Sequence, residues 1–433
     1  MFNKKILLIF LFAFLIRLIA LNQSLWLDEA ITASVVKNFS FLQIITKFSP
    51  TDFHPPLYYL FMKLWTNMFG YSEIALRMPS VLFSLGTGWV VYLIGGVWSA
   101  VFFLFNPLIV YYSQEARMYM IVTFFLTVAL YYFLKNRNQI IFGLFISLAL
   151  LTFYGSIFLI VSFLLFSLYK KNYKFFLLNT FYLILTTLII SPLLYQQLIN
   201  SKVALSQVTN WSIVLGKANL KNLLLIPIKF SIGRISFYPK WLYWGIAGTW
   251  TAFILFIIRK TVLLIRTVLI KTVFYLLIFP LILGFLVSFF TPMLQHFRFI
   301  YLIPILAIIL ASGKKTSMYR YIEVTGFVIF SLVYLLSSQF HREDWKSLVK
   351  SLPKNVPVYM IMSSSDPVKY YSRNLTINNL ASLQVSEFEK EITVIPFSFG
   401  VHGLDYKSLL RNKGYQLKKE ISFREVTYER WVR

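Results

Sequence analysis

Cysteine is absent from this chain of 433 residues, and acidic residues are scarce. The lack of cysteine excludes disulfide bonds and thiolate metal sites, and it leaves the cellular compartment open. Asp and Glu together number 16 against 42 Lys and Arg, which gives a net charge of +26. Charged residues of both signs make up only 13% of the chain, about half of what a soluble globular protein usually carries. This composition argues against an ordinary soluble protein.

Long apolar runs take the place of charge. Hydrophobic residues make up 58% of the chain and aromatic residues 19%, and apolar runs of about 17–22 residues suit a hydrocarbon core near 30 Å thick. Many basic residues lie in short loops such as "KNRN" and "YKKNYK", which is typical of the cytoplasmic face of a membrane. The partners of these loops are then anionic membrane lipids rather than nucleic acid. The predicted fold class is a polytopic α-helical protein of the cell membrane.

Hydropathy and loop charge predict about 11 transmembrane helices, with an uncleaved first helix and a cytoplasmic N-terminus. The predicted spans are residues 6–22, 77–95, 97–112, 120–134, 139–154, 156–169, 175–195, 241–258, 271–289, 299–311 and 321–337. An odd number of spans places the rest of the chain outside the cytoplasm. We therefore expect a transmembrane domain at 1–337 and an extracytoplasmic domain at 338–433.

Three segments outside the predicted spans have features of their own. The first outer loop, 23–76, contains two amphipathic stretches, 29–47 and 57–69, which we expect to lie along the membrane interface as juxtamembrane helices. The outer stretch 196–240 is basic and poor in acids, which suits an anionic ligand. From 338 onward the composition becomes polar, and runs such as "EITVIPFSF" predict a small C-terminal α/β domain.

Two of the scarce acids lie in "LWLDEA", residues 25–30, directly after the first apolar run. Polar side chains near a bilayer are costly, which makes Asp28 and Glu29 candidates for a functional role. A carboxylate partly withdrawn from water can have a raised pKa and serve as a general base toward an acceptor hydroxyl. The alternative is a helix cap, in which Asp28 begins the helix over 29–47 and Glu29 faces the helix dipole. The residues alone leave both roles open.

The same predicted outer face receives three more polar clusters, "TDFHPPLYY", "YYSQEARMY" and "QHFRF". His54, in the first cluster, is either an ordinary hydrogen-bonded side chain or a metal ligand. A metal site would need partners, and Glu115 and His296 are the natural ones. Oxygen-rich ligation suits Mg²⁺ or Mn²⁺, and Zn²⁺ is a further option for a divalent cofactor.

The basic side chains of these clusters also have two interpretations. Arg117 and Arg298 can reach lipid phosphates without a specific role, or they can bind one phosphate through two parallel hydrogen bonds. The density of polar groups in the very short turn "YSQEARMY" favours a substrate or lipid-phosphate site, with the candidate residues Gln114, Glu115, Arg117 and Tyr119. Arg342, in "REDWKSLVKSL", is expected to help pack the outer domain onto the membrane part rather than to catalyse.

Six motifs, taken in their order along the chain, resemble the bacterial and archaeal GT-C glycosyltransferases. They are "LWLDEA", "DFHPPLYYLFMKLW", "GYSEIALRMPS", "YYSQEARMYM", "FRFIYLIPILAIILASG" and "REDWKSLVKSL". These glycosyltransferases are relatives of protein O-mannosyltransferases and of the lipid A aminoarabinose transferase. The resemblance covers about residues 1–130 well and 290–350 moderately. It implies a core of seven helices, two outer juxtamembrane helices and a site at the outer membrane face. It also implies a polyprenyl-phosphate sugar donor and inversion at the anomeric carbon.

The resemblance also implies roles for single residues. Asp28 matches the acid that deprotonates the acceptor, and Glu29 completes the Asp-Glu pair of the family. His54 falls where some members place a metal-binding side chain, and Arg298 matches the basic residue near the lipid phosphate. The second outer loop, which lines the site, is matched by Gln114, Glu115 and Arg117. Two features depart from the family: the linker "GGVWS" is short and uncharged, and a second metal ligand is not identifiable.

The predicted function is therefore an inverting glycosyltransferase for a hexose or pentose on a polyprenyl phosphate. A single carboxylate base is enough for inversion, because the lipid phosphate already is a good leaving group. The acceptor can be a glycan, a lipid or a protein, and the lipid undecaprenyl or dolichyl. The main alternative is a transporter or flippase of lipid-linked saccharides, which should show polar residues near the midplane and repeated halves. A third reading is a polymerase or ligase with another fold.

Overall fold

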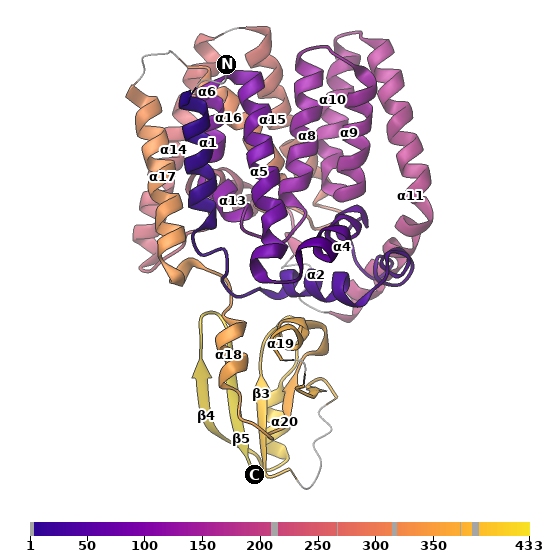
Figure 1. Ribbon diagram of the computed structural model, residues 1–433, viewed down its shortest axis with the longest axis vertical. Helices are drawn as coiled ribbons and strands as arrows, with labels where there is room; N and C mark the ends of the chain where they lie inside the picture. Colours follow the sequence, from indigo (N-terminus) through magenta and orange to yellow (C-terminus); the bar gives the residue numbers. More distant parts are fainter. Residues whose placement is uncertain (1–3, 209–214, 266, 314–317, 373, 383–388) are drawn as a thin grey trace.

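A computed structural model describes residues 4–208, 215–265, 267–313, 318–372, 374–382 and 389–433. A tall helical bundle forms one part of the molecule, and a small α/β domain hangs from one end of it (Figure 1). The N-terminus lies at the far end of the bundle and the C-terminus at the tip of the domain. The polar C-terminal domain is therefore separated in space from the apolar helices.

The helices of the bundle follow the apolar runs of the sequence. They are α1 (Lys4–Leu18), α5 (Glu73–Gly95), α6 (Val97–Leu104), α7 (Pro107–Tyr112), α8 (Tyr119–Leu134), α9 (Gln139–Thr152), α10 (Ile157–Tyr169), α11 (Tyr173–Gln207), α13 (Leu220–Ile232), α14 (Lys240–Leu264), α15 (Val268–Val287), α16 (Ile303–Ala311) and α17 (Met318–Leu336). Within the described residues, α5, α11, α14, α15 and α17 are long and apolar enough to cross a membrane. The chain is a multi-pass membrane protein.

The outer surface of the bundle is apolar. On α11, Leu177, Phe181, Leu188 and Ile189 are all more than half exposed. Soluble proteins rarely expose contiguous apolar surface of this kind, because it costs free energy in water. A lipid environment removes that cost, so this helix flank is expected to face the bilayer.

The end of α11 differs from the prediction. Residues 175–195 were expected to form the span and 196–240 an outer loop, but the helix continues to Gln207. Its 35 residues extend about 52 Å at 1.5 Å per residue. The reason is local, since neither glycine nor proline occurs between Pro192 and Gly216. The stretch 196–240 also contains a further helix, α13, which carries Lys229.

The predicted helix over 97–112 is broken in the middle. The first piece ends at Leu104. Asn106 caps the second piece, because its side-chain oxygen accepts hydrogen bonds from the backbone N–H groups of Leu108 (3.0 Å) and Ile109 (3.2 Å). Pro107 occupies the first turn of α7, where its missing N–H costs nothing. The Asn106 amide also donates to the backbone oxygen of Phe230 at 2.8 Å. The break therefore joins α7 to α13 and directs the chain into the turn at 113–118.

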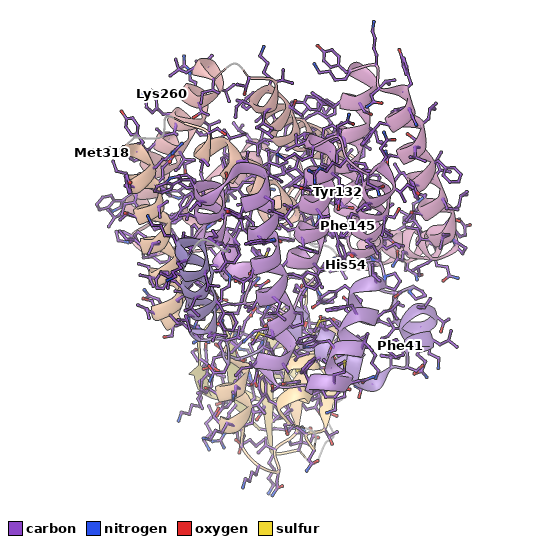
Figure 2. All side chains as sticks on the ribbon, turned by 45° about the horizontal axis from the view of Figure 1, so that its top comes forward. Phe41, His54, Tyr132, Phe145, Lys260 and Met318 are labelled. Atoms are coloured by element: carbon purple, nitrogen blue, oxygen red, sulfur yellow. The ribbon has the colours of Figure 1, made fainter. Side chains whose placement is uncertain are left out.

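The first outer loop forms a platform of short helices between the bundle and the domain (Figure 1). α4 (Leu57–Phe69) coincides with the predicted segment, but the predicted helix over 29–47 is divided into α2 (Leu27–Asn38), α3 (Phe41–Gln43) and a π-helical turn (Ile44–Phe48). Ser40 causes the division, since its hydroxyl accepts from the Gln43 N–H while the Gln43 side chain accepts from the Ser40 N–H. Phe41 lies at the outer edge of this platform and His54 toward its middle (Figure 2).

The C-terminal domain is built on one mixed sheet of the order β2-β1-β3-β5-β4. Its strands are β1 (Val358–Met360), β2 (Ile377–Asn379), β3 (Glu391–Ile395), β4 (Gln416–Ser422) and β5 (Thr427–Val432), and its helices are α18 (Trp345–Ser351), α19 (Asp366–Tyr371) and α20 (Tyr406–Asn412). β1 runs parallel to β2 and β3, and β5 runs antiparallel to β3 and β4. Because side chains alternate across a strand, Val358 and Met360 pack on one face with Trp345, and Tyr359 packs on the other with Trp431.

The domain is held on the segment that precedes Asp28. The hydroxyl of Tyr371 accepts a hydrogen bond from the backbone N–H of Leu25 at 2.8 Å. The backbone N–H of Lys346 donates to the Ser24 hydroxyl at 3.2 Å, and the Lys346 ammonium lies 3.1 Å from the Glu73 carboxylate. Both α18 and α19 therefore contact the start of "LWLDEA" or the start of α5. The domain is positioned directly over the predicted site.

Candidate active site

Asp28 is the second residue of α2, whose N-cap is Trp26. Its side chain is 34% exposed, and its Oδ2 lies 3.4 Å from a guanidinium nitrogen of Arg117. Asp28 does not cap the helix, which begins two residues earlier than that role requires. Its carboxylate instead lines a large cavity between the bundle and the C-terminal domain. A partly exposed, arginine-paired carboxylate at a cavity wall is positioned to receive a proton from a ligand hydroxyl.

Glu29 occupies a different environment. It is fully buried, and its carboxylate accepts from Arg77 Nε at 2.8 Å and from a second Arg77 nitrogen at 2.5 Å. The same carboxylate accepts from the backbone N–H of Ala116 at 2.7 Å and from that of Trp26 at 3.4 Å. Glu29 is not part of the cavity wall, although it was predicted with Asp28 as a catalytic pair. Its contacts tie α2 to α5 and to the turn at 113–118, and it supplies the capping contact that was open for either acid.

Glu115 and Arg342 form an ion pair that crosses between the two parts of the protein. The Arg342 guanidinium donates to Glu115 Oε1 at 3.2 and 3.3 Å, and its central carbon lies 3.8 Å above the ring of Trp26. Burial raises the pKa of the Glu115 carboxyl, while the Arg342 charge lowers it. The expectation that Arg342 only packs the outer domain was too narrow, because its side chain also lines the cavity.

Arg342 joins the two segments that carry the Asp28–Arg117 pair. Trp26 stands two residues before Asp28 in α2, and Glu115 stands two residues before Arg117 in the turn. A guanidinium held between Trp26 and Glu115 therefore restrains both partners of the pair at once. The position of the candidate base depends in this way on a side chain just ahead of the C-terminal domain.

Two further predicted residues have structural partners instead of cavity positions. The Gln114 amide donates to the backbone oxygens of Arg17 at 2.9 Å and Ile19 at 2.6 Å, which fixes the end of α1. The Tyr119 ring packs against the rings of Tyr112 and Phe297 at centroid distances of 5.2 and 5.6 Å. Neither side chain belongs to the cavity wall. Both side chains contact other residues of the bundle and do not face the cavity.

Arg298 also lies outside the wall. Its guanidinium donates to the backbone oxygens of Leu215 at 3.1 Å and Pro292 at 3.3 Å, and it is positioned beside the ring of Phe297. These contacts shape the loop before η3 (His296–Leu302). Arg298 itself does not line the cavity, but its sequence neighbours His296 and Phe297 do.

The three predicted metal ligands do not come together. Nδ1 of His54 lies 3.2 Å from Asp52 Oδ1, Glu115 pairs with Arg342, and His296 lies in the cavity wall with its Nε2 buried and unpartnered. Among the residues that the structure describes, no group of three or more His, Asp or Glu is arranged to hold a metal ion. The predicted set therefore does not fit a shared metal.

The cavity has a volume of about 940 Å³ and is bounded by both parts of the protein. From the bundle, the platform and the linker come Trp26, Leu27, Asp28, Ile31, Val208, Lys229, Arg234, Ser236, Gln295, His296, Phe297, Gln339, Phe340, His341, Arg342 and Glu343. From the C-terminal domain come Ser363, Ser364, Phe397, Ser398, Val401, His402 and Glu425. A volume of this size is in the range of small-molecule sites.

Two basic residues of this wall were not predicted individually. Arg234 donates to the Tyr111 hydroxyl at 3.0 Å, and Lys229 of α13 donates to the Tyr243 hydroxyl at 3.1 Å. Burial and, after it, the nearby charges of Arg234 and Lys240 together lower the pKa of Lys229 to about 7. The available signal was the basic character of 196–240 on the outer side. That signal indicated an anionic ligand without indicating which cations would reach it.

Comparison with known proteins gives a fold. No protein-family model matches the chain, and no curated protein sequence matches it. Two solved structures of ArnT from Cupriavidus metallidurans match it along its whole length. The apo structure has a TM-score of 0.62 and 12% sequence identity, and it covers 99% of this chain and 98% of that chain. The chain has the fold of ArnT. The second structure, of ArnT bound to undecaprenyl phosphate, has a TM-score of 0.62 with 11% identity over the same shares.

The match to ArnT extends over the bundle and the C-terminal domain together, since almost nothing of either chain is left out. This agreement in fold is in line with the resemblance that the motifs indicated. The similarity in sequence is low over this length, and the likeness places no individual side chain. The roles of Asp28 and of the basic wall therefore depend on the geometry of this chain.

Proposed function

We propose that the protein is an inverting glycosyltransferase that moves a sugar from a polyprenyl-phosphate donor to an acceptor hydroxyl. The observation that carries this proposal is the composition of the cavity wall, where the Asp28 carboxylate is exposed to the same space as the cations Lys229, Arg234 and Arg342. One carboxylate with several cations suits a reaction in which a hydroxyl loses a proton and a phosphate leaves.

The chemical step can be written with the Asp28 carboxylate and the cationic side chains of the wall. Asp28 accepts the proton of the acceptor hydroxyl while that oxygen attacks the anomeric carbon. The bond from this carbon to the phosphate oxygen breaks on the opposite face, and its electron pair leaves with the lipid phosphate. Cationic side chains stabilise the charge that develops there. Because a single displacement occurs, the configuration inverts and one carboxylate is sufficient. Arg117 orients the Asp28 carboxylate through their contact of 3.4 Å.

The fold supports a lipid donor. One of the two matching ArnT structures is bound to undecaprenyl phosphate, and the bundle of this chain exposes apolar side chains to the bilayer. A polyprenyl tail would lie against these helices and bring its phosphate to Lys229 and Arg234 at the end of the bundle. The donor sugar, a hexose or a pentose, would then lie between that phosphate and Asp28.

The charge at the two ends of the bundle supports an extracytoplasmic site. The loops around 136 and 170–172 meet the start of α15 at the end opposite the C-terminal domain, and Lys170 lines the groove between them. Lys260 and Met318 lie at that same far end (Figure 2). Basic loops favour the cytoplasmic side. The platform, the cavity and the C-terminal domain would then face the outside of the cell membrane.

The proposed activity is tested with purified protein and a panel of polyprenyl-phosphate sugars, in the presence of acceptor-rich membrane extract. We expect mass spectrometry to show the loss of one class of donor and the release of polyprenyl phosphate. The anomeric configuration of the product, read by NMR, should be opposite to that of the donor. Transport of an intact lipid-linked saccharide across liposomes, with no donor turned over, would support the transporter alternative instead.

Donor binding is expected to weaken as the pH rises from 6 to 8. Lys229, with its pKa lowered to about 7, is a cation below this pH and a neutral amine above it, so its attraction to a phosphate is lost with rising pH. Full loss of this one charge gives a fall in affinity of about tenfold over two pH units. Titration calorimetry with a polyprenyl-phosphate sugar measures it. Lys229→Arg, which stays charged, should bind with little pH dependence, and an equal pH dependence in that variant would contradict the assignment.

A further inference from the structure

We propose that the C-terminal domain holds the acceptor, and that the acceptor is a saccharide bound to a wall of hydroxyl groups and one aromatic ring. This hydroxyl wall consists of Ser363, Ser364, Phe397, Ser398 and His402, all of which line the cavity opposite the bundle. That the bound saccharide is the acceptor rests on the proposed function. The binding of a saccharide to the wall does not.

The two sides of the cavity differ in charge. Lys229, Arg234 and Arg342 all come from the bundle or the linker, whereas the described lining residues of the domain include neither lysine nor arginine. The one acid among them, Glu425, lies next to Glu343 of the linker. A phosphate would therefore bind on the bundle side, where the lipid arrives from the membrane. The opposite side is left for an uncharged ligand.

The sheet topology explains why these residues come together. β1 and β3 are parallel neighbours, so both end at the same edge of the sheet. β1 is followed by η5 (Met362–Ser364), and β3 is followed by the loop at 396–402. These two connections supply the hydroxyl wall. The carboxyl ends of parallel strands are the usual place for ligands in α/β sheets, and here that edge faces Asp28 across the cavity.

The wall is held in a defined geometry. The hydroxyls of Ser364 and Ser398 are hydrogen-bonded to each other at 2.7 Å, and Ser398 has a φ of 62°, which is uncommon for a residue other than glycine. The Phe397 ring packs edge-on against the buried ring of Trp345 at a centroid distance of 4.9 Å. Two hydrogen-bonded hydroxyls and a packed ring thus belong to the same wall of the cavity.

This chemistry suits a saccharide. A serine hydroxyl can donate one hydrogen bond and accept others, so it can pair with sugar hydroxyls in either sense. An aromatic side chain offers a flat apolar surface, which matches the C–H face of a pyranose ring. Cavities that bind small molecules commonly combine such rings with a few polar groups that fix orientation. The wall has both, and it lies on the side from which the acceptor hydroxyl must approach Asp28.

The test measures saccharide binding to the full-length protein in nanodiscs. The probe is a panel of fluorescently labelled neutral oligosaccharides of glucose, mannose, galactose and N-acetylglucosamine. We expect at least one of them to bind, and Ser398→Gly to weaken that binding by about tenfold through the loss of hydrogen bonds. Glycine tolerates the positive φ at this position, so Ser398→Gly removes the hydroxyl without straining the backbone. Phe397→Leu tests the ring separately.

Ser422→Ala is the matched control. Ser422 also shares a hydroxyl–hydroxyl hydrogen bond, to Thr427 at 3.1 Å, but it lies on exposed β4 outside the cavity wall. The Ser422→Ala protein should bind the saccharide with the same affinity as the unaltered protein. All variants should bind undecaprenyl phosphate with unchanged affinity.

Failure to bind any member of the panel, or equal affinity in Ser398→Gly and the unaltered protein, would overturn the inference while leaving the glycosyltransferase proposal standing. The converse result is also distinguishable: a protein that binds a saccharide at this wall but turns over no polyprenyl-phosphate sugar contradicts the proposed function alone.

Discussion

Asp28→Asn is expected to lower the rate of sugar transfer by about 10²–10⁴-fold, the usual contribution of a positioned general base. Asparagine has nearly the same shape as aspartate but cannot take up the proton of the acceptor hydroxyl. Because the Asp28 side chain is partly exposed and does not cap α2, its replacement weakens only the contact with Arg117 at 3.4 Å. The loss should therefore appear in the chemical step, with membrane insertion, thermal stability and donor binding close to those of the unaltered protein.

The matched control for this variant is Asp405→Asn. Asp405 caps α20 in the C-terminal domain, where its side chain accepts from the Ser408 N–H at 3.2 Å, and asparagine caps a helix about as well as aspartate. The same chemical change at a distance from the cavity should leave transfer intact. Single-turnover rates measured with saturating donor compare the two variants directly. An Asp28→Asn protein that transfers sugar at the normal rate would sink the assignment of the base.

The sequence predicts where most apolar helices of the bundle lie, because their apolar runs are long. The count of 11 spans stays a prediction, since five helices of the described residues are long and apolar enough to cross a membrane. The sequence predicts poorly where a local polar group decides the geometry. Asn106 breaks the helix expected over 97–112, and Ser40 divides the one expected over 29–47. The end of α11 was misplaced for the opposite reason, since the helix continues through residues 196–207, where neither glycine nor proline occurs.

The candidate site shows the same division between local and long-range information. Asp28, Glu115 and Arg117 could be singled out because charges are costly beside apolar helices. Their partners could not, because the pairs depend on how distant segments meet. Arg342 is separated from Glu115 by 227 positions. Arg234 lines the cavity and is held there by a hydrogen bond to the Tyr111 hydroxyl. Spacing in a sequence carries no signal for either contact.

Glu29→Gln is expected to destabilise the protein by about 3–5 kcal/mol, the usual cost of removing one partner from a buried ion pair. The change leaves the Arg77 guanidinium buried without a counter-charge, because Glu29 and Arg77 are both almost completely inaccessible. It also weakens the contact to the Ala116 N–H, which holds the turn carrying Arg117. The folded fraction after extraction into detergent, measured by size-exclusion chromatography and thermal unfolding, should fall sharply.

The paired change Glu29→Gln with Arg77→Gln separates structure from catalysis. Two neutral amides remove the uncompensated charge, so the double variant should be more stable than either single variant, as a double-mutant cycle can show. If Glu29 is the structural anchor that its contacts indicate, the double variant should recover transfer activity in proportion to its recovered folding. If Glu29 takes part in proton transfer, stability will return while transfer stays as low as in Asp28→Asn. The two acids of "LWLDEA" are then distinguished by what each loss removes: the folded state for Glu29 and the chemical step for Asp28.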